Sequence, residues 1–162
     1  MTVLLCSEIK AEHLDDLLQR FGLEVKRMPV NQPLPGSFWK APEAGLIGDV
    51  LYISDETPVH SALHESCHYI CMDQPRRKKL HTDAGGTAIE ENATCYLQIL
   101  LSDLIPEMGR ERSFKDMDEW GYSFRLGSAQ AWLEQVAEDA LEWLIEHKLI
   151  NSKQHPCFLL RQ

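Results

Sequence analysis

The sequence predicts an α+β fold, mostly helical, in a single domain that spans residues 1–162. A chain of 162 residues is long enough to bury one core. Short segments that alternate apolar and polar residues, bounded by Pro and Gly, are confined to the first third of the chain. Beyond residue 57, apolar residues recur at helical spacing. We therefore expect a small antiparallel N-terminal sheet that packs against a larger set of helices.

The N-terminal third is predicted to contain one helix and three short strands. Residues 10–20 form an amphipathic pattern, with Leu14, Leu17 and Leu18 on one side and Gly22 at the position of a C-terminal cap. The segments predicted to be strands are 23–30, 37–40 and 49–54, with a turn region between the last two. The 49–54 strand is a candidate edge strand that could align an extended peptide.

Helices are expected to dominate the remainder. Thr57 and Pro58 form an N-cap and first-position pair, so a helix should begin there and run to about Met72. The basic run 76–79 is interpreted as a solvated face. Further helices are predicted over 88–104, 114–122 and 128–147, and the apolar stripe of the last one is expected to belong to the core.

Within the helix predicted after Pro58, residues 64–68 read H-E-x-x-H. Positions i and i+4 share one helix face, so His64 and His68 can hold one metal ion between them. Glu65 points about a quarter turn away, where it can act as a general base on a water molecule. The competing interpretation is a helix that carries two surface histidines by chance.

A hydrolytic zinc site needs three protein ligands and a fourth position open to water, so another element must supply a ligand. The adjacent carboxylates Glu90 and Glu91, near the start of the next long helix, are the obvious source. Neighbours on a helix point about 100° apart, so only one of the two can face the metal. Helical geometry alone leaves both open.

These motifs resemble those of the gluzincin class of metallopeptidases, in which H-E-x-x-H is followed by a glutamate ligand on the next helix. The compact intracellular ImmA/IrrE-like members carry a downstream pattern E-x-x-A-N-x-F-A-x-x-L-L. In this chain the pattern falls on Glu90, Ala93, Tyr96 and Leu100-Leu101. The resemblance covers residues 51–101 and departs at Thr94, where relatives carry Asn or Asp, and at Cys67, where they carry a small residue.

The resemblance implies a minimal zincin-like hydrolase that binds one zinc per chain and cleaves peptide bonds in a peptide or protein substrate. It also implies Glu65 as the catalytic base and His64, His68 and Glu90 as metal ligands, with Glu91 as the alternative third ligand. The C-terminal helices resemble no family that would identify the substrate.

Several other residues could extend or modify such a site. His60 and Cys71 lie near the histidine stripe, and a closed set that included either would be structural zinc in a non-catalytic binding or regulatory protein. His81 and Asp83 are either solvated loop residues or partners that orient a ligand. Tyr122 and Arg125 are candidate donors to an oxyanion, although packing and a surface ion pair are the simpler explanation for them.

Composition excludes some functions. The chain has 16 Lys and Arg against 25 Asp and Glu, a net charge of −9, which argues against a nucleic-acid-binding surface. We expect no signal peptide and no membrane span. The five cysteines form no C-x-x-C pair, so we expect reduced thiols and a cytoplasmic location. The pattern predicts no oligomeric state.

Overall fold

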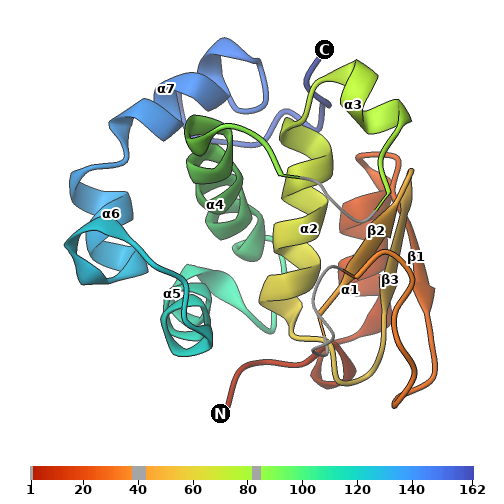
Figure 1. Ribbon diagram of the computed structural model, residues 1–162. Helices are drawn as coiled ribbons and strands as arrows, with labels where there is room; N and C mark the ends of the chain where they lie inside the picture. The colour runs from red at the N-terminus through yellow and green to blue at the C-terminus, as the bar shows by residue number, and fades with distance from the viewer. Residues whose placement is uncertain (1, 38–42, 82–84) are drawn as a thin grey trace.

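The computed structural model describes residues 2–37, 43–81 and 85–162, and it confirms the α+β fold. A three-stranded sheet lies on one side of helix α2, and α4 lies on the other (Figure 1). Helices α5, α6 and α7 pack around α4 on the side away from the sheet. The elements, in chain order, are η1 (Cys6–Glu8), α1 (Ala11–Gln19), β1 (Glu24–Arg27), β2 (Gly45–Ile47), β3 (Val50–Ile53), α2 (Val59–Cys71), α3 (Gln74–Lys78), α4 (Ala88–Ser102), α5 (Gly109–Trp120), η2 (Arg125–Gly127), α6 (Ala129–Gln135) and α7 (Glu138–Glu146).

The sheet has the strand order β1-β3-β2 and is mixed, not antiparallel as predicted. Strand β1 pairs with β3 in parallel, whereas β2 pairs with β3 antiparallel. The segment that forms β2 was expected to be a turn region. It forms a strand because Leu46 is fully buried and pairs with Leu51, which is also fully buried. Of the predicted strand 37–40, Ser37 is outside any strand and the rest lies outside the described residues.

Strand β3 is central, so it is not the edge strand that was expected to align a peptide. Both of its edges are already paired, with β1 and with β2. On its outer side, β2 receives two further contacts: Leu46 N donates to Gly36 O at 3.2 Å, and Ile47 forms a bridge with His81. The backbone groups of the sheet nearest α2 are therefore largely engaged within the chain.

Helix α2 begins one residue later than the Thr57-Pro58 pair predicted, with Pro58 as the N-cap, no side-chain cap and Val59 as the first helical residue, and it ends at Cys71. Two arginines donate hydrogen bonds to carbonyl groups at its C-terminal end. Arg77 donates to Tyr69 O at 2.9 Å and to Met72 O at 2.6 Å, and Arg161 N donates to Ile70 O at 3.0 Å. The basic run was expected to be a solvated face. In the structure it forms most of α3, with Asp73 as N-cap, and Arg77 in it caps the end of α2.

The C-terminal half differs from prediction in its helix boundaries. The single helix expected over 128–147 is two helices, because Val136 (φ −136°) leaves the helical region. The break lets α7 pack along α4 while α6 contacts α5. Helix α5 begins earlier than predicted and ends at Trp120, and the left-handed conformation of the C-cap Gly121 (φ 103°) places Tyr122 outside the helix. Within the described part of the chain, every helix is too short or too polar to cross a membrane.

Candidate metal centre

Three predicted side chains meet between α2 and α4. His64 Nε2 lies 3.1 Å from His68 Nε2, and the two nitrogens lie 3.1 Å and 3.0 Å from the two carboxylate oxygens of Glu91. The imidazoles cross at 89° with centroids 4.6 Å apart. The histidine side chains are largely buried, whereas that of Glu91 is 45% exposed. This group could hold a metal ion.

The donor set fits a small divalent cation. In a tetrahedral site with bonds of about 2.0–2.1 Å to zinc, ligand atoms stand about 3.3–3.4 Å apart. The separations of 3.0–3.1 Å are a few tenths of an ångström shorter, so only a slight spreading of these side chains would admit an ion. Two imidazole nitrogens with one carboxylate are also the donor types of hydrolytic zinc sites.

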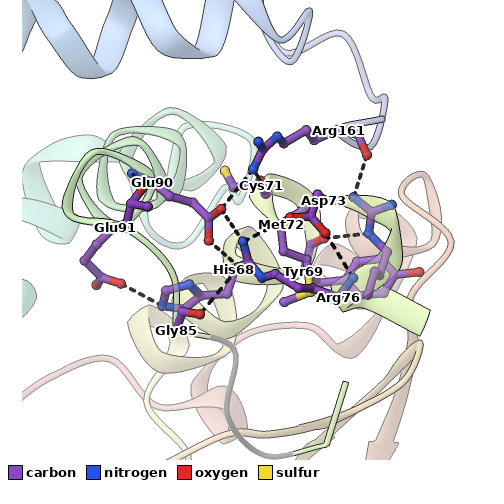
Figure 2. Close-up of polar contacts among 12 residues, drawn as sticks. His68, Tyr69, Cys71, Met72, Asp73, Arg76, Gly85, Glu90, Glu91 and Arg161 are labelled. Carbon is purple, nitrogen blue, oxygen red and sulfur yellow. Dashed lines mark hydrogen bonds and ion pairs between the residues drawn. The ribbon is translucent and has the colours of Figure 1, made fainter. Parts of the chain in front are cut away.

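Glu91, not Glu90, stands beside the histidines, which corrects the third ligand expected from the resemblance. The register of the downstream pattern placed Glu90 at that position. On α4, however, the adjacent residue faces the α2 histidines, and Glu90 points toward α3 and the C-terminal tail (Figure 2). The 100° step between neighbours separates the two carboxylates, as geometry requires. The orientation of α4 in the fold decides which of Glu90 and Glu91 faces the histidines.

Glu90 is the anchor of a buried ion cluster. Its side chain is 2% exposed and accepts two hydrogen bonds from Arg76, at 2.8 Å and 2.6 Å. Arg161 Nη1 donates to the same carboxylate at 3.0 Å. Two guanidinium groups stabilise a charge that burial alone would make unfavourable. Glu90 therefore fixes the start of α4 to α3 and to the tail, one residue before Glu91.

Gln98 orients His64 and was not predicted. Its Oε1 lies 2.8 Å from His64 Nδ1, and its Nε2 donates to His60 O at 3.0 Å. Because the amide oxygen is an acceptor, His64 Nδ1 carries the proton and Nε2 keeps its lone pair for a metal. Gln98 lies seven residues after Glu91, two turns along the same face of α4, and this spacing could have identified it.

Without a metal ion, the charges of the group are coupled. Burial lowers the pKa of His64, but Tyr122, Cys95 and Glu91 outweigh it and raise that pKa well above its usual value. Burial raises the pKa of Glu91, yet its hydrogen bonds to His64 and His68 lower it overall. In the metal-free group, these neighbours thus favour the charged form of the His64 imidazole and of the Glu91 carboxylate.

Glu65 lies on the adjoining face of α2, beside the group and outside it. Burial raises the pKa of this carboxyl, an effect that the neighbouring His64 and His68 partly offset. Glu43 and Glu91 add smaller contributions that also raise it. A carboxyl with a raised pKa, close to two imidazoles but hydrogen-bonded to neither, suits proton transfer.

Of the two candidate donors to an oxyanion, only Tyr122 lies against the histidines. Tyr122 packs its ring against His64 at 5.4 Å, and its hydroxyl lies 3.1 Å from His60 Nδ1. Burial raises the pKa of Tyr122 to about 12, so the phenol stays protonated. Arg125 is exposed on η2.

His60 and Cys71 are not in the metal-binding group among the described residues. His60 packs against Trp120 and Tyr122. Burial raises the pKa of the Cys71 thiol to about 12, which disfavours a thiolate ligand. His81 is exposed and bridges to Ile47, whereas Asp83 lies outside the described residues. The nitrogen of His68 that faces away from the group, Nδ1, has no hydrogen-bond partner within residues 2–37, 43–81 and 85–162.

Comparison with family models, curated proteins and solved structures finds no significant match to this chain.

Proposed function

We propose that this chain is a zinc-dependent metallopeptidase that hydrolyses peptide bonds in a peptide or protein substrate. The observation that supports it most is the convergence of His64 Nε2, His68 Nε2 and the Glu91 carboxylate at 3.0–3.1 Å, with Glu65 beside them. Three protein ligands leave a coordination position open to water, as catalytic sites require. Zinc is the metal of choice, although a two-histidine, one-carboxylate site also accepts other divalent ions.

Zinc held by these three residues would polarise a water molecule and lower its pKa. Glu65 accepts a proton from the attacking water and passes it to the leaving amine, and its raised pKa suits both steps. Gln98 keeps the imidazole of His64 in the tautomer whose Nε2 faces the group. The Tyr122 hydroxyl, held near His64 by His60, is the candidate donor to the oxyanion.

The decisive variant is Glu65→Gln, which keeps the side-chain shape and removes the base. We expect it to bind as much zinc as the parent chain and to lose hydrolysis of a pool of internally quenched fluorogenic peptides. Glu56→Gln, an exposed carboxylate outside the group, is the matched control and should cleave as the parent does. Equal cleavage by the parent and by Glu65→Gln would refute the proposed base.

A metal-stabilised binding or regulatory protein without turnover is the alternative function. Such a protein would hold its ion with four protein ligands, which leaves no position for water. The described residues bring three ligands together, and neither His60 nor Cys71 joins them. The peptidase is therefore better supported than the closed structural site.

A further inference from the structure

A cavity of about 400 Å³ opens at the C-terminal end of α2, the helix that carries His64 and His68. Met72 and Leu80, both buried, and the exposed Pro75 contribute apolar lining, and Arg76, Lys79, His81 and Gly85 contribute the rest. Met72 follows His68 by four residues, so it lies on the same face of α2 about 6 Å further along the axis. Figure 2 shows His68, Met72, Arg76 and Gly85 in one neighbourhood. A chain bound across the histidines would reach this cavity within a residue or two.

The cavity lies in the most basic part of an acidic chain. Residues 76–79 read Arg-Arg-Lys-Lys, whereas the whole chain has a net charge of −9. Two of these cations are already engaged: Arg76 pairs with Glu90, and Arg77 donates to backbone carbonyls. Lys79 is exposed, and its ammonium forms no ion pair with any described residue. A cation without an ion-pair partner in the described part of the chain therefore lines a cavity that also has apolar lining residues.

The apolar lining residues and the Lys79 cation together indicate which kind of ligand would fit the cavity. An apolar floor accepts methylene groups, and a cation at the rim favours an anion at their end. A volume of about 400 Å³ is ample for one amino-acid side chain and is within the range of small-ligand sites. We propose that the cavity is a specificity pocket for an acidic side chain, glutamate above all, near the scissile bond, with Lys79 as the residue that recognises the carboxylate. The assignment to a substrate rests on the proposed peptidase function.

Binding can be tested without hydrolysis. The zinc-loaded Glu65→Gln chain, labelled with ¹⁵N, would be titrated with N-acetyl-glutamate N-methylamide and separately with the isosteric glutamine compound. We expect the glutamate compound to shift the amide signals of Met72, Leu80 and Gly85, and to bind at least about threefold more tightly than the glutamine compound, the size of effect that a partly exposed ion pair supports. Lys79→Gln should abolish the difference, and Lys115→Gln, an exposed lysine of α5, should retain it. Equal affinity for both compounds, or shifts elsewhere, would overturn the pocket.

A hydrolysis experiment separates this inference from the function on which it rests. Fluorogenic peptides in matched pairs would carry Glu or Gln at each position, all with amidated C-termini, so that a side-chain carboxylate is distinguished from a chain terminus. Cleavage that depends on Glu65 and prefers Glu over Gln, with the preference lost in Lys79→Gln, supports both proposals. Glu65-dependent cleavage with no such preference overturns the pocket alone. Carboxylate binding at the cavity without any cleavage overturns the peptidase and leaves the acidic-ligand site standing.

Discussion

Arg161 Nη1 lies 3.0 Å from Glu90 Oε1 and 3.2 Å from the carbonyl oxygen of Cys71. One side chain near the C-terminus thus joins α4, where Glu91 follows Glu90, to α2, where Cys71 follows His68 by three residues. The backbone N–H of Arg161 also donates to Ile70 O at 3.0 Å. The C-terminal tail therefore adds a link between the two helices that carry the candidate ligands, which also pack directly on each other.

Replacing Arg161 with Ala should weaken zinc binding about tenfold, the lower range for residues that hold a ligand in place. Arg161→Lys keeps one charge and should restore part of the loss. The measurement is a competition titration against a chromophoric chelator. Arg20→Ala is the control, because Arg20 stacks on Phe158 of the same tail, 3.3 Å from the ring centroid, and has no contact with Glu90. Equal losses for both variants would show a general effect of loosening the tail.

Gln98→Leu should weaken zinc binding by about 10- to 100-fold, because His64 loses the acceptor that fixes its tautomer. Ser102→Ala removes another fully buried polar group from α4, one turn further along, and should leave zinc affinity unchanged. Isothermal titration calorimetry of both variants checks the prediction. Unchanged affinity in Gln98→Leu would mean that the hydrogen bond to His64 does not orient a ligand.

His60 should contribute to acid lability. Burial lowers its pKa to about 3, with a further effect from His64, whereas the unfolded chain has the usual value near 6.5. Between those values the unfolded chain binds more protons, so stability falls as pH falls through this window. Between pH 7 and pH 5, the protonation of His60 in the unfolded chain lowers the free energy of unfolding by about 2 kcal/mol. His60→Asn should lose correspondingly less stability over that interval in urea denaturation. An unchanged pH dependence in the variant would contradict the assignment.

Gly86 should tolerate no side chain. A Cβ at this position would lie 2.6 Å from Cδ of Glu90 and 3.0 Å from Nη2 of Arg76. Gly86→Ala should lower the free energy of unfolding by about 1–3 kcal/mol, as overpacking does elsewhere. In the Glu90→Ala background, the same substitution should cost markedly less, because the carboxylate is gone. A double-mutant cycle by thermal denaturation measures the coupling, and additive losses would contradict it.

Much of the fold was predictable because local rules decided it. The Thr57-Pro58 pair predicted the start of α2 to within one residue, although Pro58 and not Thr57 is the N-cap, and the spacing of His64 and His68 placed both imidazoles on one face. Strand β2 was missed because three residues, Gly45–Ile47, carry no visible alternation, and only pairing with β3 makes them a strand. The break at Val136 was likewise invisible, since α6 and α7 have one continuous apolar period and part only to pack on different helices.

The candidate site, too, was predictable where local sequence decides and not where long-range packing decides. Helix geometry predicted that only one of the two adjacent carboxylates would face the histidines. Whether Glu90 or Glu91 does so depends on the rotation of α4 about its axis. That rotation depends on long-range contacts of Glu90 with Arg76 and Arg161, which lie 14 and 71 residues away in the sequence. Local spacing carries no information about partners so distant. Gln98, in contrast, could have been identified from its place on the Glu91 face.

The most direct test of the account is zinc content, measured by elemental analysis of the parent chain, Glu91→Ala and Glu142→Ala after loading and dialysis. We expect about one zinc per chain in the parent and in Glu142→Ala, whose carboxylate lies on α7 outside the group, and a large loss in Glu91→Ala. A parent chain that retains no zinc, or a Glu91→Ala chain that retains as much as the parent, would contradict the three-residue metal centre.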